Sequence, residues 1–223
     1  MKLTKFELLL WAASSLAVTA SFFLSPEKNY LTLITSLLGA AALIYLAKGY
    51  VLGQVLTLIF ASLYGVISLS FRYYGEAISY LCMSAPMALL SLFSWLKNPY
   101  GKRSEVRIAR LKRRHLIILL PLSASVTVAF YFILRALNTP NLVLSTVSIL
   151  TSFVASYLTY ARSKYYALAY ALNDIVLITL WVLASLTDPS YVPMTACFLA
   201  FLFNDLYAFF NWGKMSEKQE RGV

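Results

Sequence analysis

Long apolar runs, separated by short polar breaks, cover almost the whole chain. Each run is long enough to cross a hydrocarbon core of about 30 Å as a helix. The regular alternation of apolar and polar residues that marks a transmembrane β-barrel is not found. The pattern therefore predicts an all-α polytopic membrane protein with about eight transmembrane helices, at residues 6–24, 31–47, 51–71, 77–95, 116–134, 142–160, 165–186 and 192–211.

The composition strengthens this prediction and narrows the possible functions. Of the 223 residues, 60% are hydrophobic and only 13% are charged. The first apolar run lacks a small-residue cleavage site before Ser25-Pro26, so we interpret it as a retained helix of a single transmembrane domain over residues 1–223. No nucleotide-binding glycine loop, zinc-spaced cluster or nucleophile motif is found. The sequence therefore indicates a protein that is not an enzyme, with no catalytic residue, metal site or cofactor.

Basic residues gather on one side of the predicted topology. With both termini placed inside, sixteen of the nineteen lysines and arginines fall on the inner side, and only Lys28, Arg72 and Arg135 fall outside. Cytoplasmic loops carry such an excess of Lys and Arg. This predicts a multi-pass protein of the cell membrane with both termini in the cytoplasm. Because topology and contact with the lipid bilayer explain the net charge of +10, no nucleic-acid partner is expected.

The second half of the chain repeats the first at a slowly drifting separation. The ending Phe93-Ser94-Trp95-x-Lys97 returns as Phe210-Asn211-Trp212-x-Lys214, in step with the order of the segments. Four crossings per copy give both copies the same orientation, which defines a parallel repeat with its substrate site between the halves. We expect repeat one at residues 6–97, a basic cytoplasmic linker at 97–115 and repeat two at 116–214.

Two polar pairs, Asn173-Asp174 and Asn204-Asp205, interrupt the last two apolar runs. Counted from the inner ends of their helices at about 1.5 Å per residue, both lie about 14 Å deep, near the middle of the membrane. A carboxylate there costs at least about 2.5 kcal/mol, so the pairs serve either as hydrogen-bonding contacts between helices or as the lining of a polar cavity. We favour the cavity. Arg72 and Glu76, one helical turn apart in a predicted outer loop, are interpreted as a local ion pair.

Helical spacing places aromatic side chains on the same faces as these amides. Tyr166, Tyr170, Asn173 and Trp181 share one face of their helix, with Asp174 beside it. Flat rings interleaved with amides suit a ligand that is part planar ring and part polyol, because the ring stacks and the hydroxyls take hydrogen bonds. The predicted substrate-binding residues are Asn173, Asp174, Tyr166, Tyr170, Trp181, Asn204, Tyr207, Gln54 and Tyr64.

The chain resembles the PnuC family of vitamin transporters from about Tyr30 onward. The resemblance is carried by Lys48-Gly49, Gly53, Tyr64, Tyr74-Gly75-Glu76, Pro86-Met87, Trp95, Asn173 and Phe209-Phe210-Asn211-Trp212. It implies a 3+1+3 core like that of the SWEET sugar transporters, with the fifth segment as linker helix and the first as an N-terminal addition. It also implies uptake of nicotinamide riboside or a related vitamin by facilitated diffusion, trapping by a cytosolic kinase and, as in some members, a homotrimer.

One departure from the family pattern leaves the substrate open. Nicotinamide-riboside members carry Trp-x-x-Trp followed by Asn four residues on, whereas Tyr166 and Ala169 precede Asn173 here. Tyr170 or Trp181 is a candidate for the missing ring contact. Relatives without the tryptophan pair carry thiamine, riboflavin or deoxynucleosides, which are therefore alternative substrates. Proton or cation coupling through Asp174 or Asp205 is an alternative mechanism, and a lipid-modifying membrane enzyme or a scaffold is an alternative class.

Overall fold

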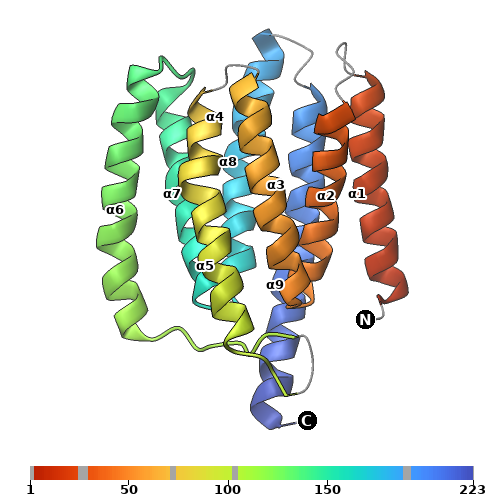
Figure 1. The fold of residues 1–223 in the computed structure, drawn as a ribbon. Coiled ribbons are helices and arrows are strands. Elements are labelled where there is room, and N and C mark those ends of the chain that lie inside the picture. The colour runs from red at the N-terminus through yellow and green to blue at the C-terminus, as the bar shows by residue number, and fades with distance from the viewer. Residues whose placement is uncertain (1–2, 25–29, 71–73, 102–104, 188–191, 223) are drawn as a thin grey trace.

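The eight apolar runs form eight membrane-length helical spans in the computed structural model (Figure 1). The structure describes residues 3–24, 30–70, 74–101, 105–187 and 192–222, so the predicted positions Lys28 and Arg72 lie outside the described residues. The helices are α1 (Lys5–Leu24), α2 (Tyr30–Ala47), α3 (Val51–Ser70), α4 (Tyr74–Ile78), the π-helix η1 (Ser79–Ser84), α5 (Ala85–Leu96), α6 (Arg113–Ala136), α7 (Leu142–Tyr160), α8 (Tyr166–Thr187) and α9 (Val192–Arg221).

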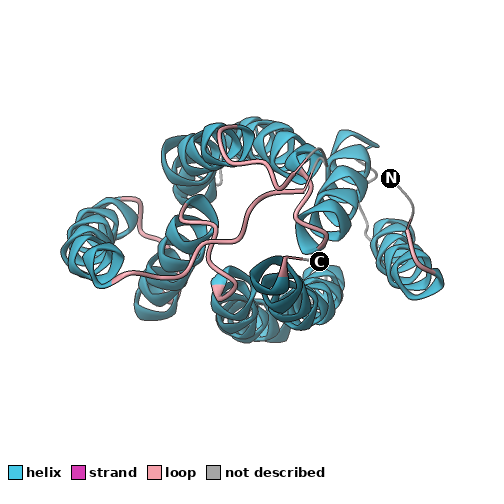
Figure 2. Ribbon diagram, turned by 90° about the horizontal axis from the view of Figure 1, so that it is seen from below, coloured by secondary structure: helices cyan, strands magenta, loops and turns pink. Residues whose placement is uncertain are grey.

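Six of these spans close into a ring. Neighbours around it are α2, α3, α5, α7, α8 and α9, and α9 returns to α2. Two helices stand outside the ring: α6 packs on α7, and α1 packs on α2 and α9 (Figure 2). Three spans from each half with α6 between them make the expected 3+1+3 core, and α1 is the N-terminal addition.

Both ends of the chain point to the same end of the bundle. The start of α1, the C-terminal part of α9 and residues 97–101 and 105–112 all lie there (Figure 1), and we name it the linker end. The opposite end carries the α6–α7 connection, where Asn138 and Asn141 adopt the left-handed conformation with φ of 53° and 51°. The termini and the linker therefore share one side, as an even number of crossings requires.

Several helix bounds differ from the sequence prediction, among them those of the fourth and the last spans. The fourth span begins at Tyr74 and runs to Leu96 without a break, although it changes from α to π and back to α. The last helix continues past the predicted end at Asn211 to Arg221. Polar residues end an apolar run but not a helix, because Lys, Glu and Gln are good helix formers in water.

The outer surface of the bundle is apolar. On α6, for example, Ile117, Leu120 and Phe132 are each at least 60% exposed. Contiguous apolar surface of this kind marks a membrane or protein contact. The spans therefore present the surface that a lipid bilayer requires.

Candidate functional site

A cavity of about 390 Å³ lies inside the ring of helices, on the side away from the linker end. It begins at the α6–α7 connection, where Asn138 and Asn141 line it, and extends to Ile149 of α7 and Asn173 of α8. Both halves of the chain contribute lining residues, whereas α1 and α2 contribute none. The cavity thus lies between the halves, where a parallel repeat places its substrate.

The cavity wall combines aromatic rings with small polar groups. Ligand sites commonly join apolar surface to a few polar groups that fix orientation. The aromatic lining residues are Tyr64, Tyr74, Tyr80, Trp181 and Phe198, and the polar ones are Glu76, Ser79, Ser84, Asn138, Thr139, Asn141, Ser145, Ser148, Ser152 and Asn173. Of the nine predicted substrate-binding residues, the structure brings Tyr64, Asn173 and Trp181 to this wall.

Asn173 is the predicted central residue, and it lines the cavity with a fixed amide. Its side chain is buried, and its Oδ1 accepts a hydrogen bond of 2.8 Å from Thr151 Oγ1 on α7. Because the amide oxygen is used in this way, the Nδ2 group is the part of the side chain suited to donate to a ligand oxygen.

Glu76 supplies the carboxyl group of the cavity wall. Tyr64 donates its hydroxyl to Glu76 Oε2 at 2.9 Å, which joins α3 to α4. The ring of Tyr64 packs against that of Tyr80, with centroids 4.5 Å apart. The sequence interpretation assigned Glu76 to an ion pair with Arg72, which lies outside the described residues. Because of that assignment, Glu76 was not among the predicted substrate-binding residues, although it lines the cavity.

The π-helix η1 shapes this side of the cavity. Its widened turn starts at Ser79 and ends at Ser84, and Ser79, Tyr80, Met83 and Ser84 all line the cavity. π-Helical turns are rare and are frequent at functional sites. No periodicity in the sequence marks such a turn.

The second half contributes an aromatic pair. Trp181 of α8 and Phe198 of α9 both line the cavity, and their rings stack with centroids 6.4 Å apart and planes 13° apart. Trp181, one of the two candidates for the missing ring contact, therefore lies on the cavity wall.

Tyr166 and Tyr170 lie away from the cavity. Tyr166 is 1% exposed and packs edge-on against Trp212, with centroids 4.6 Å apart. Tyr170 shares a 3.0 Å hydrogen bond with Ser156 of α7. Both residues hold α8 against its neighbours in this structure.

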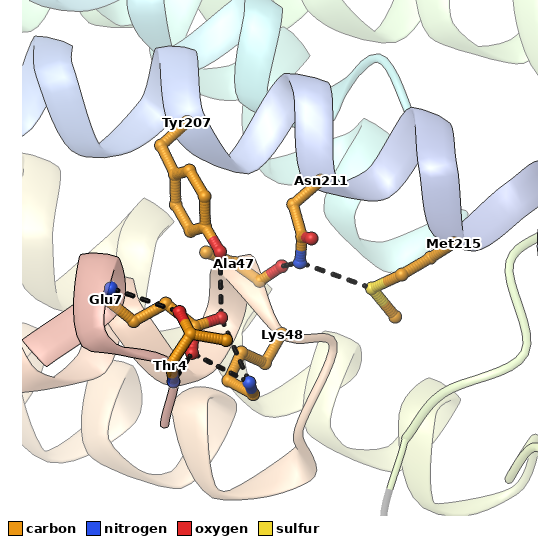
Figure 3. Close-up of polar contacts among 7 residues, drawn as sticks. All are labelled: Thr4, Glu7, Ala47, Lys48, Tyr207, Asn211 and Met215. Carbon is orange, nitrogen blue, oxygen red and sulfur yellow. Dashed lines mark hydrogen bonds and ion pairs between the residues drawn. The ribbon is translucent and has the colours of Figure 1, made fainter. Parts of the chain in front are cut away.

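Asn204 and Tyr207 point from α9 toward α1, as Figure 3 shows for Tyr207. Asn204 Nδ2 donates to Ser14 Oγ at 2.7 Å, and the Tyr207 hydroxyl donates to Glu7 Oε1 at 2.8 Å. Glu7, whose side chain is 2% exposed, also pairs with Lys48 at 2.9 Å. The polar face of α9 therefore meets the N-terminal helix, which the sequence alone could not pair with it.

Asp174 of α8 lies near Asp205 of α9, whereas the two asparagines point apart, Asn173 to the cavity and Asn204 to α1. Both carboxyl groups are buried, and Asp174 Oδ2 has no hydrogen-bond partner among the described residues. Gln54 is 1% exposed, and its Nε2 likewise has no partner among the described residues. None of these three side chains lines the cavity.

Two buried tryptophan side chains fill the space inside the ring of helices at the linker end. Trp95 of α5 and Trp212 of α9 are both fully buried, with centroids 5.4 Å apart. Trp95 Nε1 donates to the carbonyl of Thr159 on α7 at 3.0 Å, and Trp212 Nε1 donates to that of Leu46 on α2 at 2.9 Å. Each indole thereby joins the two halves of the chain.

A strap of chain crosses this closed end (Figure 2). We name residues 105–109 the linker strap. The amide of Val106 donates to the carbonyl of Gly49 at 2.8 Å, and the amide of Ala109 donates to that of Arg162 at 2.9 Å. Gly49 and Arg162 are both left-handed residues at the ends of α2 and α7, with φ of 66° and 55°. The linker strap therefore bonds to corresponding points of both halves.

Comparison with known proteins agrees with this architecture. Residues 29–214 match the family model described as nicotinamide mononucleotide transporter. The chain is 24% identical over 213 residues to the nicotinamide riboside transporter PnuC of Neisseria mucosa, covering 93% of this chain and 81% of that protein. It is 23% identical over 211 residues to the PnuC of Haemophilus influenzae, covering 93% and 90%.

A solved structure shares the fold. The crystal structure of the vitamin B3 transporter PnuC superposes with a TM-score of 0.80 at 23% identity, covering 97% of this chain and 94% of that one. The family match covers most of the chain and includes both halves of the ring. The chain therefore belongs to the nicotinamide mononucleotide transporter family, the PnuC family of membrane transporters rather than a family of enzymes.

Proposed function

We propose that this protein takes up nicotinamide riboside across the cell membrane by facilitated diffusion. The observation that carries the proposal is the cavity between the two halves, with stacked aromatic rings on one wall and the oriented amide of Asn173. The rings suit the planar base and the amide suits a sugar hydroxyl or a carboxamide. Trapping by a cytosolic kinase and assembly as a homotrimer belong to the same proposal.

The charge distribution supports an orientation for this cavity. Sixteen of the nineteen basic residues fall on the linker-end side of the predicted topology, which favours the cytoplasm for that end and for both termini. The cavity then faces the outside, and the buried Trp95 and Trp212 close the path inward. In this reading the structure is an outward-facing state, and a rocking of the two halves opens the linker end.

A liposome panel tests the proposal. Purified protein is reconstituted and offered nicotinamide riboside, thiamine, riboflavin and deoxynucleosides, the last three being the alternative substrates. We expect nicotinamide riboside to enter fastest. Equal entry into protein-containing and empty liposomes for every compound would overturn the transport proposal.

Two variants on α8 connect this transport to the cavity. Asn173→Ala removes the cavity amide, and we expect uptake to fall by about tenfold or more, because substrate oxygen atoms lose a buried donor. Thr179→Ala is the matched control, since Thr179 is an exposed polar residue of the same helix. Unchanged uptake by Asn173→Ala would contradict the proposal that the substrate binds in this cavity.

The carboxyl pair favours a second candidate, proton-coupled or cation-coupled uptake. Asp174 and Asp205 are both buried and lie near each other. Two adjacent carboxylates repel one another unless they share a proton or bind a cation. Coupled uptake would collapse when an uncoupler removes the ion gradient. Facilitated diffusion predicts unchanged initial rates in the same measurement.

A further inference from the structure

The cavity wall carries an unbalanced charge. Among the described residues that line it, Glu76 is the only acidic side chain, and no lysine, arginine or histidine accompanies it. A single carboxylate on the wall of a cavity within the protein makes that cavity favourable for a positive charge, because electrostatic interactions are stronger there than in bulk water.

The carboxyl group of Glu76 is held in place. The hydroxyl of Tyr64 donates to Oε2 at 2.9 Å, and a carboxylate has lone pairs to accept further partners. Tyr64 is itself fixed, because its ring lies against Tyr80 at 4.5 Å and against Phe60 at 5.7 Å. The position of the charge in the cavity is therefore set by packing.

Aromatic faces accompany this charge on both sides of the cavity. Tyr64 and Tyr80 come from the first half, and Trp181 and Phe198 come from the second. The negative faces of such rings attract cations within about 6 Å, most strongly when the site excludes water. A flat ring that carries a positive charge would gain from both features at once, whereas an uncharged ring would gain only the stacking.

We propose that Glu76, positioned by Tyr64, is the residue through which this transporter prefers substrates with a positively charged ring. The inference rests on the proposed function, because it concerns the choice of substrate at the same cavity. It divides the candidate substrates by their chemistry. The pyridinium of nicotinamide riboside and the thiazolium of thiamine carry the charge, while riboflavin and deoxynucleosides do not.

A pair of nearly identical probes isolates the charge. Nicotinamide riboside and its dihydro form differ by one hydride on the ring, so their sizes match while only the oxidised form is cationic. We measure initial uptake of both into liposomes containing the protein as it stands, Glu76→Gln or Tyr64→Phe. Glu220→Gln is the control, since Glu220 is an exposed acidic residue at the C-terminal end of α9.

The unaltered protein is expected to take up the cationic form faster. Glu76→Gln should lower uptake of that form by about tenfold or more and leave uptake of the dihydro form unchanged, because only the cationic form loses a charged partner. Tyr64→Phe should shift the ratio the same way by less, and Glu220→Gln should not shift it. An equal loss for both probes, or no loss, would overturn the inference and return Glu76 to a structural role.

A competition measurement on the unaltered protein keeps the inference testable if a variant does not fold. 1-Methylnicotinamide, which is a cation because its ring nitrogen is methylated, should inhibit uptake of nicotinamide riboside at about tenfold lower concentration than uncharged nicotinamide. Equal inhibition by both would overturn the inference. If nicotinamide riboside does not enter at all, the proposed function fails, whereas uptake without charge preference overturns only the role of Glu76.

Discussion

Trp95 and Trp212 occupy corresponding places in the two halves, and each donates its indole N–H to the last turn of a helix in the other half. The accepting carbonyls belong to Thr159 and Leu46, at the ends of α7 and α2. The two indoles also touch one another, with centroids 5.4 Å apart. The same indole-to-carbonyl hydrogen bond is thus made twice, once from each half of the chain to the other, at the closed end of the ring of helices.

Replacing either tryptophan with phenylalanine should loosen this closed end. Trp95→Phe and Trp212→Phe each remove one buried donor and part of a ring, and we expect each to lower the free energy of unfolding by about 1–3 kcal/mol. Thermal unfolding in detergent or lipid measures the loss. Trp11→Phe is the control, because Trp11 is 40% exposed on α1. Equal unfolding temperatures for Trp95→Phe and the control would contradict the prediction.

The side-chain amide of Gln219 on α9 should hold the linker strap in place. Gln219 Oε1 accepts from the amide of Ile108 at 2.8 Å, and its Nε2 donates to the carbonyl of Val106 at 3.1 Å. Gln219→Ala removes both bonds, so the strap should open more often and trypsin should cut after Arg107 about tenfold faster. Glu217→Ala, an exposed change on the same helix, is the control. If the two variants were cut at the same rate, Gln219 would not hold the strap.

The Glu7–Lys48 pair should show strong coupling. Lys48→Met leaves the Glu7 carboxylate buried without its cation, at a cost of about 3–5 kcal/mol in unfolding free energy. Adding Glu7→Gln should recover much of this loss, because the unpaired charge is then gone. A double-mutant cycle by thermal unfolding measures the coupling, with Lys5→Met as an exposed control. Losses that simply add in the double variant would show that the pair is not coupled.

Gly53 and Gly213 should respond to alanine in opposite ways. A Cβ at Gly53 would lie 2.6 Å from the backbone nitrogen of Leu46, so Gly53→Ala must push α3 away from α2, at about 1–3 kcal/mol. At Gly213 nothing lies within 4 Å of the added atom, and a helix interior gains about 0.5–1 kcal/mol from alanine. Unfolding temperatures of the two variants test both signs. An unchanged unfolding temperature for Gly53→Ala would show that α2 and α3 can move apart at this contact without loss of stability.

Much of the fold could be predicted from the sequence, because a membrane span leaves a long and unambiguous apolar signal. The eight spans and the 3+1+3 arrangement are confirmed by the ring and its two outlying helices. The C-terminal bound was wrong, because α9 leaves the apolar region and continues as a polar helix that reaches the linker strap. At the C-terminal end of α9, the length of the apolar run predicts where the membrane span ends, whereas helix propensity decides where the helix ends.

The site was less predictable, because helical phase shows which residues share a face but not what that face meets. Asn204 and Tyr207 share a face of α9, and that face meets α1. Asn173 and Trp181 share a face of α8, and that face meets the cavity. Glu76 was missed because a basic residue stood four positions away and suggested a local partner. The contact between Tyr64 and Glu76 depends on how α3 packs on α4, which no local pattern encodes.

The contacts of the first helix have a consequence for synthesis in the membrane. Glu7 and Ser14 of α1 bond to Tyr207 and Asn204 of α9, which are made almost two hundred residues later. Until α9 has been inserted, α1 lacks both of these partners, while Thr4 and Lys48 are already available to Glu7. The polar contacts of α1 with α9 are therefore completed only after α9 is in place, although α1 can pack on α2 earlier.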